Sequence, residues 1–279
     1  MNNKAPLISI IIPCYNDAVY IEQSVNSALN QSYSNIEVIV VDDGSNEKTK
    51  TVLKSIEPKL TKLITQENKG QSTARNVGIK EAKGEYIVTL DSDDFFEPGF
   101  CENAVILLNS DAAIKLISCN TTIIYDNGIK QLYNPKGGMI QSFILNNCAL
   151  GSVLFKKEDW NTLGGYDETM RKGFEDWEFY IRILKNGGYA AIIPKMLFNY
   201  RRRTNSTTTK ANNKKYELLN YIYTKHKDLY IENYEPFVSY LLKTVEREEF
   251  EKIKNTQRIE FKIGKALLKP FHFIKSLIK

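Results

Sequence analysis

The stretch Leu7-Ile-Ser-Ile-Ile-Ile-Pro-Cys-Tyr-Asn16 is a short, nearly continuous apolar run that ends in polar residues. A second run of the same kind spans Ile36 to Val41. Such runs are typical of strands buried on both faces. Between them, Ile21, Val25 and Ala28 recur at helical spacing. The three segments therefore predict a β-strand, an α-helix and a second, parallel β-strand.

The same alternation continues downstream. The pattern predicts a helix near 47–56, a strand near 63–66, a helix through 74–82 and a strand over 86–90. Alternating strands and helices favour an α/β fold with a Rossmann-like, mostly parallel, doubly wound sheet. Further β-rich stretches lie near 116–124, 152–155 and 190–200, with a helix after Asp176. After about Thr209 only helices are expected, so we predict a domain over residues 1–209 and a helical extension over 210–279.

Composition narrows the class of protein. Charged residues make up 25% and hydrophobic residues 42% of the 279 residues, as in soluble globular proteins. No apolar run reaches the roughly 18 residues that a membrane span needs, and the N-terminus lacks the apolar core of a signal peptide. These features predict a cytoplasmic protein. The net charge of +5 is mild and does not indicate nucleic-acid binding.

Cysteine and histidine give no sign of a zinc or disulfide site. The four cysteines are widely spaced, so buried reduced thiols are favoured. The two histidines, His226 and His272, lie far from the acidic motifs in sequence. A histidine-based metal or nucleophile site is therefore not expected.

Asp91-Ser92-Asp93-Asp94 places three carboxylates in four residues at a predicted strand end. Their mutual repulsion is costly without a cation. Oxygen ligands with no nearby histidine favour Mg²⁺ or Mn²⁺, and either ion also binds diphosphate oxygens. The alternative is a solvated acidic turn or a helix cap.

Two more motifs fall near strand ends, where ligands bind in parallel α/β sheets. Asp42-Asp43-Gly44-Ser45 offers hydrogen-bond acceptors for a base or a ribose, or it forms a simple turn. The segment Gly70 to Asn76 brings Arg75 into the early turns of a helix. That cation is expected either to meet a phosphate or to lie on the surface.

A second acidic region comprises Gly164 to Glu168 and Gly173 to Glu178. Helical spacing after Asp176 puts Glu175 and Asp176 at a helix N-terminus, which suits an ionised general base. Trp177 and Tyr166 are candidates for stacking on a sugar, although a buried tryptophan more often belongs to the core. In Arg201-Arg202-Arg203, the first residue is a candidate diphosphate contact and the other two are expected at a solvated rim.

Taken in order, the motifs Pro13 to Asn16, Asp42 to Ser45, Ala74-Arg75-Asn76, Asp91 to Asp94, Gly164 to Glu168 and Glu175-Asp176 resemble the family 2 glycosyltransferases of GT-A fold. The likeness spans about residues 5–205. It implies a metal-dependent, inverting transfer of a sugar from a nucleotide donor, usually a UDP-sugar, to an acceptor hydroxyl. It also implies a nucleotide-sugar half over about 5–100 and an acceptor half over about 101–209.

The resemblance also implies a role for each matching residue. Asp176 would be the catalytic base, Asp93 the main metal ligand, and Asp91 a contact to the ribose, the donor sugar or the metal. The acceptor-side residues would be Glu175 and Trp177. The residue patterns described above add Tyr166 on the acceptor side and Arg201 as a candidate diphosphate contact. The remaining donor-binding residues would be Pro13, Tyr15, Asn16, Asp42, Asp43, Arg75 and Ser92.

The C-terminal segment is basic and amphipathic. Apolar residues from Ile259 to Ile278 trace one helical face, with lysines at 262, 265, 269, 275 and 279 around it and Pro270 interrupting. Such a helix is expected either to lie on the inner face of the cell membrane or to pack on protein. Membrane contact would make a polyprenyl-linked saccharide a plausible acceptor in envelope or capsular polysaccharide synthesis.

Two other functions remain open from the sequence. An aspartate-based phosphatase also places aspartates after a strand, but its motif needs Thr or Val where Phe95 stands. A non-catalytic protein that binds a nucleotide-sugar or a partner is the second alternative, because a fold does not fix a function.

Overall fold

The structure is a computed structural model that describes residues 5–204 and 206–277. Two compact units make up the chain, Met1–Lys227 and Asp228–Lys279. The first unit contains a 9-stranded sheet, and the second is helical. In the part of the chain that is described, no helix is long and apolar enough to cross a bilayer.

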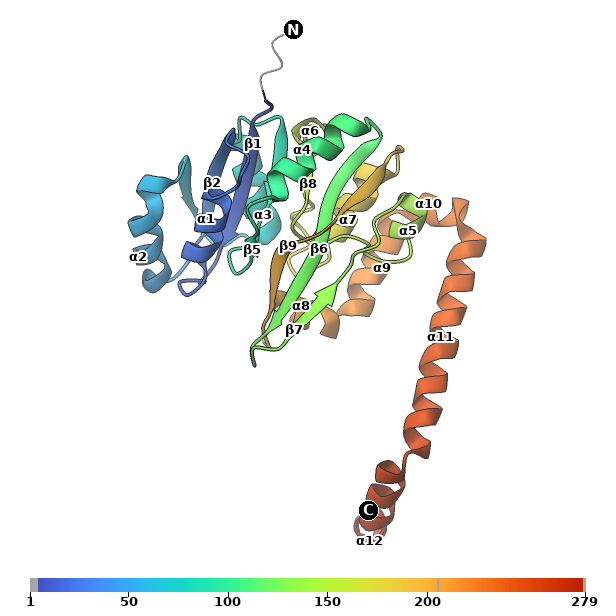
Figure 1. Ribbon diagram of the computed structural model, residues 1–279. Helices are drawn as coiled ribbons and strands as arrows, with labels where there is room; N and C mark the ends of the chain where they lie inside the picture. The colour runs from blue at the N-terminus through green and yellow to red at the C-terminus, as the bar shows by residue number, and fades with distance from the viewer. Residues whose placement is uncertain (1–4, 205, 278–279) are drawn as a thin grey trace. The chain divides into compact units, whose positions relative to one another are not determined.

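The first part of the sheet has the predicted alternation of strands and helices (Figure 1). Its elements are β1 Ile8–Cys14, α1 Ile21–Leu29, β2 Ile36–Asp43, α2 Glu47–Ile56, the short 3₁₀ helix Glu57–Lys59, β3 Lys62–Gln66, α3 Gln71–Glu81 and β4 Tyr86–Thr89. These strands lie in the order β3-β2-β1-β4, and each neighbouring pair is parallel. The prediction of a parallel, doubly wound sheet is confirmed here.

The remaining strands make the sheet mixed. The elements are β5 Phe95–Phe96, α4 Phe100–Ser110, β6 Ile114–Tyr125, β7 Lys130–Tyr133, α5 Ile140–Phe143, β8 Leu154–Lys156, α6 Lys157–Leu163, α7 Glu175–Leu184 and β9 Tyr189–Arg202. The short β8 runs antiparallel to both of its neighbours, β4 and β6, while the long β6 and β9 pair in parallel. The three β-rich stretches and the helix predicted for this half are all present.

Both faces of the sheet are covered, which explains the continuous apolar runs. Ile8, Ile10 and Ile12 of β1 belong to a buried cluster with residues of α1, α2 and α4. The intervening Ile11 faces α3, where a Cβ atom on Gly78 would lie only 2.5 Å from the Ile11 side chain. Figure 1 shows α1 and α4 in front of the sheet, with α3 and α7 behind it. The four cysteines are free and buried, as predicted.

The boundary of the first unit differs from the prediction. Helices α8 Thr207–Asn213 and α9 Lys215–Lys225 belong to it, so the unit ends after Lys227 rather than near Thr209. Leu218 and Ile222 of α9 are buried. The loss of strand signal at Thr209 therefore marks a change of secondary structure within one compact unit.

The second unit begins at the second residue of α10 Lys227–Glu232 and contains α11 Tyr234–Gln257 and α12 Ile259–Leu277. Helix α12 continues through Pro270, where the sequence predicted an interruption. The described apolar side chains of α12 include Ile259, Ile263 and Leu267, which are all exposed. The side chains of Lys269, Lys275 and Lys279 lie outside the described residues, as does Ile278.

Candidate active site

A cavity of about 880 Å³ lies at the carboxyl ends of β1, β2 and β4, which is where ligands bind in sheets of this kind. Its volume suits a ligand of moderate size. The lining includes Pro13, Tyr15, Asp43, Arg75 and Asp176. Residues that are widely separated in sequence are thus collected around one space.

Asp43 fixes the loop that leads into α3. Its Oδ1 atom accepts hydrogen bonds from the Gln66 side chain at 2.7 Å and from the Lys69 backbone N–H at 2.8 Å. Its Oδ2 atom accepts one from the Gly70 N–H at 2.8 Å. The carboxylate is therefore held rigidly at the cavity wall, where a hydrogen-bond donor of a nucleobase could reach it.

Asp42 and Asn16 connect two loops and are not among the residues that line the cavity. The Asp42 carboxylate accepts the Ser45 N–H at 2.9 Å. Asn16 has a φ of 60°, its N–H donates to the Ser45 hydroxyl at 3.0 Å, and its side chain accepts the Asn46 N–H at 2.7 Å. Both residues are predicted to bind the donor, and in the structure their hydrogen bonds hold the loops next to the cavity lining.

Arg75 is the buried centre of the site. Its Nη2 atom donates to Asp91 and its Nη1 atom to Glu175, both at 2.7 Å, and only 1% of its side chain is exposed. Its guanidinium also lies 5.4 Å from the centre of the Tyr166 ring. Burial opposes the charge, but the two carboxylates raise the pKa of Arg75 well above its usual value. Arg75 therefore links the Asp91 motif to the Glu175-Asp176 motif.

The carboxylates of the Asp91–Asp94 motif have different partners. Asp91 accepts a second hydrogen bond, from Gln71 at 2.7 Å. Asp94 is buried, and its side chain accepts the Arg201 N–H at 2.7 Å. Ser92 donates to Asp17 at 2.5 Å. Only Asp91 and Asp93 therefore have carboxylates that are both partly exposed and placed at the cavity.

The electrostatics of Asp93 fit a cation. Burial and the neighbouring charge of Asp91 raise the pKa of Asp93 to about 6, against the opposing effect of Arg203. Oxygen ligands of this kind suit Mg²⁺ or Mn²⁺. Within residues 5–204 and 206–277, however, no three Asp, Glu, His or Cys side chains are grouped closely enough to hold a metal ion by themselves. Asp91 and Asp93 fit a metal whose other ligands come from a diphosphate or water.

Glu175 and Asp176 begin α7, as the helical spacing predicted. Burial raises the pKa of Glu175 to about 7, although Arg75 opposes the shift. Burial also raises the pKa of Asp176, again against Arg75. Asp176 lines the cavity and accepts a hydrogen bond from Asn147 at 3.0 Å. A carboxylate whose proton affinity is raised in this way can act as a general base.

The two aromatic residues predicted on the acceptor side are largely buried. Trp177 is 6% exposed, and its indole N–H donates to the Phe143 carbonyl at 2.6 Å. Tyr166 is 2% exposed and is not among the residues that line the cavity. The centre of its ring lies 4.3 Å from that of Phe179. The position of Tyr166 does not allow it to stack on a sugar, because its ring belongs to the core.

Phe174 lines the cavity next to Asp176 and was not singled out from the sequence. Its φ of 64° is rare for a bulky residue and costs about 1–3 kcal/mol. Its ring lies 5.7 Å from that of Trp177. In the sequence, the glycine that precedes Phe174, Gly173, is the signal that could have indicated a turn at this position.

The three arginines at the end of β9 have different contacts. The Arg201 guanidinium lies over Tyr20 and Phe95, at 4.9 and 4.8 Å, and also donates to Gln23 and to the Asp93 carbonyl. It lines the cavity, and one N–H group of each terminal nitrogen is already engaged. Arg203, which was expected at the rim, forms an ion pair with Asp93 at 2.5 Å.

His226 is close to the second acidic motif, contrary to the expectation from sequence distance. Its Nε2 atom lies 3.1 Å from Oε1 of Glu178, which is completely buried. Lys225 and Arg182 also form ion pairs with this carboxylate. Burial alone would raise the pKa of Glu178, but these hydrogen bonds lower it to about 2. The cluster attaches α9 to the helix that carries Asp176.

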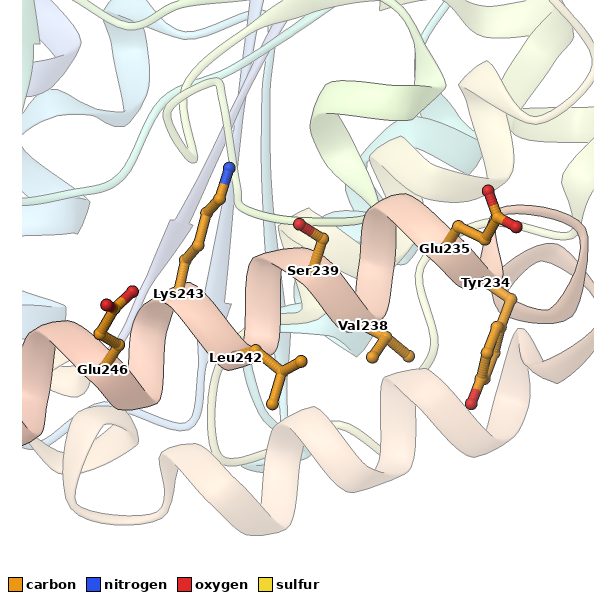
Figure 2. Close-up of a pocket in the computed structure, with 7 residues that line it drawn as sticks. All are labelled: Tyr234, Glu235, Val238, Ser239, Leu242, Lys243 and Glu246. Carbon is orange, nitrogen blue, oxygen red and sulfur yellow. The ribbon is translucent and has the colours of Figure 1, made fainter.

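A second hollow, of about 560 Å³, lies along α11 in the helical unit. Figure 2 shows its seven residues, Tyr234, Glu235, Val238, Ser239, Leu242, Lys243 and Glu246, all on that one helix. Because its described lining comes from a single helix, this hollow does not have the convergent polar groups of a catalytic site.

Comparisons with known proteins agree with this arrangement. The model for glycosyl transferase family 2 matches residues 9–163, and a model described as the N-terminal domain of galactosyltransferase matches residues 143–207. An uncharacterized glycosyltransferase of Rickettsia prowazekii is 31% identical over 99% of this chain and 84% of its own length. A chondroitin synthase of Escherichia coli is 30% identical over 68% of this chain. The chain spans 28% of that synthase and 60% of a similar Rickettsia typhi protein.

Solved structures confirm the predicted GT-A fold. Staphylococcus aureus TarS 1–349 in complex with UDP-GlcNAc has a TM-score of 0.62 and 22% identity, covering 74% of this chain and 61% of that one. The mannosyltransferase PcManGT from Pyrobaculum calidifontis, in complex with GDP-Man and Mn²⁺, has a TM-score of 0.58 and 21% identity over 74% of this chain and 60% of its own.

Proposed function

This chain belongs to glycosyl transferase family 2, and we propose that it transfers a sugar, with inversion, from a nucleotide-diphosphate donor to a hydroxyl group of a glycan or lipid-linked acceptor. A UDP-sugar is the proposed donor, and cell-envelope or capsular polysaccharide synthesis is the proposed process. The observation that carries the proposal is one cavity lined by Asp91, Asp93 and Asp176. The carboxylates proposed to act on the leaving diphosphate and the one proposed to act on the acceptor hydroxyl thus line the same cavity.

In this proposal the donor lies against the ends of β1 and β2. Pro13 and Tyr15 would contact the base, and Asp43 would accept a hydrogen bond from it. Tyr15 is 51% exposed, so its ring is available to a ligand. Arg75 is almost completely buried at the cavity wall, and its proposed role is to hold Asp91 in place beside the diphosphate.

Asp93 and Asp91 would hold the divalent metal, Mn²⁺ or Mg²⁺. When bound, such an ion neutralises charge on the departing diphosphate. The raised pKa of Asp93 is consistent with this role, since a cation relieves the repulsion between the two carboxylates.

Asp176 would take the proton of the acceptor hydroxyl as that oxygen attacks the anomeric carbon. The C–O bond to the acceptor forms while the bond to the diphosphate breaks, so a single displacement inverts the configuration. Asn147 orients the Asp176 carboxylate by its hydrogen bond. Glu175 remains paired with Arg75 and supports the start of the helix.

The test is metal-dependent UDP release from a panel of UDP-sugars, with and without saccharide acceptors. The wild-type chain is compared with Asp93→Ala and Asp176→Ala, and Glu57→Ala is the control because its side chain is exposed and does not line the cavity. We expect strong loss in the first two variants and none in the control. Unchanged release in both would refute the site.

We also propose that the protein works in the cytoplasm and contacts the inner face of the membrane through α12. The exposed side chains of Ile259, Ile263 and Leu267 are available for this contact, and nearby lysines attract anionic lipid by about 1 kcal/mol each. Flotation with anionic liposomes is expected for the wild type and reduced for Lys262→Glu combined with Lys265→Glu. Equal flotation would exclude this surface.

A further inference from the structure

One side of the cavity is basic. Arg171 and Lys172 come from the loop before α7, and Lys210 and Lys214 come from α8 and the residue that follows it. We call these four residues the basic rim. All four line the same cavity as Asp176.

Among the residues that the structure describes, Arg171 and Lys210 form no ion pair, whereas Glu217 attracts both Lys172 and Lys214. Arg171 donates to two oxygens of Asn68, which are neutral, at 3.1 and 3.4 Å. Lys172 pairs with Glu217 at 2.7 Å. Lys210 and Lys214 are exposed and form no salt bridge within residues 5–204 and 206–277. Arg171 and Lys210 therefore differ from Arg75 and Arg203, whose charges are paired with the carboxylates of the site.

The rim is attached to the segment that carries the proposed base. Gly173 has a φ of 112°, and a Cβ atom added to it would lie 2.6 Å from the Ala211 side chain of α8. Ala211 is itself buried. This close packing places Lys210 and Lys214 next to the turn that continues through Phe174 into Asp176. Lys210 and Lys214 are thus on the acceptor side of the proposed site, whereas Arg171 reaches the loop of Asn68 on the donor side.

We propose that the acceptor is an anionic saccharide, with a phosphate or carboxylate group near the hydroxyl that is glycosylated. The inference rests on the proposed function and narrows its acceptor class. Unpaired cations at a partly enclosed cavity attract an anion, because a hydrogen bond between two charged groups is stronger than one between neutral groups. Phe174, half-buried beside the rim, offers an apolar surface for the face of the accepting sugar.

Two matched pairs of probes test this and distinguish the source of the anion. The first pair is N-acetylglucosamine linked to farnesyl diphosphate and farnesyl N-acetylglucosaminide, which lacks phosphate. The second is a hyaluronan tetrasaccharide, which carries carboxylates, and neutral chitotetraose. Dissociation constants are measured by calorimetry with the full chain in the presence of UDP and Mn²⁺.

The wild type should bind the anionic member of at least one pair ten times or more tightly than its neutral counterpart. Lys210→Glu combined with Lys214→Glu should abolish the preference without changing the affinity for UDP. The control, Lys48→Glu combined with Lys54→Glu, makes the same charge change on α2, away from the cavity lining, and should keep the preference.

The inference is overturned if neither anionic probe is preferred or bound, or if the rim variant keeps the preference. Loss of UDP affinity in the rim variant would also overturn it, because the rim would then serve the donor. Failure of the proposed function has a separate sign: the wild type would bind no nucleotide or nucleotide-sugar at all.

Discussion

The Nη2 atom of Arg203 lies 2.5 Å from the Oδ2 atom of Asp93. A residue from beyond the end of β9 thus places its cation beside the carboxylate that we propose as the main metal ligand. Arg203 also donates to Asp17 at 3.0 Å, and Asp17 in turn accepts a hydrogen bond from Ser92. Arg203 and a divalent metal would therefore compete for the same carboxylate.

The first prediction follows from this competition. Arg203→Ala should bind Mn²⁺ several-fold more tightly than the wild type when no nucleotide is present, because the internal cation is gone. Electron paramagnetic resonance of free Mn²⁺ measures this directly. Arg202→Ala is the matched control, since the Arg202 guanidinium lies 5.7 Å from the centre of the Tyr125 ring and does not line the cavity. Unchanged or weaker binding in Arg203→Ala would contradict the prediction.

Asp93 should make stability depend on pH. Its pKa is raised from 3.8 to about 6 in the folded state. Between pH 4 and pH 6, Asp93 is therefore mostly protonated in the folded protein and mostly ionised in the unfolded chain. The free energy of unfolding should therefore fall as pH rises through this window. In EDTA, Asp93→Asn should make the free energy of unfolding less dependent on pH. At pH 7 the variant should be more stable than the wild type by roughly 1–3 kcal/mol. Denaturant unfolding from pH 4 to 7 tests this, and a parallel shift of the whole curve would contradict it.

Transfer by Asp176 should fail at low pH. The reaction needs the ionised carboxylate, and burial raises its pKa, so the rate should begin to fall at a higher pH than for an exposed aspartate. Asp176→Asn should lower the rate about 10²–10⁴-fold and leave the dissociation constant for UDP unchanged. A pH–rate profile with a UDP-binding measurement checks both; weakened UDP binding would instead indicate a donor-side role.

Replacing Arg75 should destabilise the fold. In Arg75→Ala, Asp91 and Glu175 would stay buried or partly buried without their shared cation, at a cost of about 3–5 kcal/mol. Arg75→Lys should recover only part of this, because a single ammonium does not reproduce two guanidinium hydrogen bonds 2.7 Å long. Thermal unfolding of the wild type, Arg75→Lys and Arg75→Ala should give stabilities that decrease in this order. Equal stability of the wild type and Arg75→Lys would contradict the prediction.

Asp43→Asn should weaken nucleotide binding about tenfold or more. One end of its side chain would become an N–H donor facing the donors of Lys69 or Gly70, so the loop at the cavity wall would shift. Calorimetry with UDP measures the effect. Asp42 does not line the cavity, so Asp42→Asn should weaken UDP binding less than Asp43→Asn does. A larger loss of UDP affinity in Asp42→Asn would contradict the prediction.

Much of the fold could be predicted because its signals are local. The runs around Ile10 and Val40 are apolar on both faces, since helices cover both sides of the sheet. The antiparallel insertion of β8 was not predictable in the same way, because three residues carry too little pattern to define a neighbour. The position of α9 in the first unit depends on contacts with the distant Glu178.

The sequence by itself determined the succession of elements in the parallel half and the acidic motifs at its strand ends, because periodicity and turn chemistry act over a few residues. Only the tertiary structure decided how those groups are paired. It brought Arg75 between Asp91 and Glu175, Arg203 rather than Arg201 to the Asp93 carboxylate, and the Tyr166 ring into the core. These outcomes depend on which side chains meet across long sequence separations, and on the burial that then sets their charges.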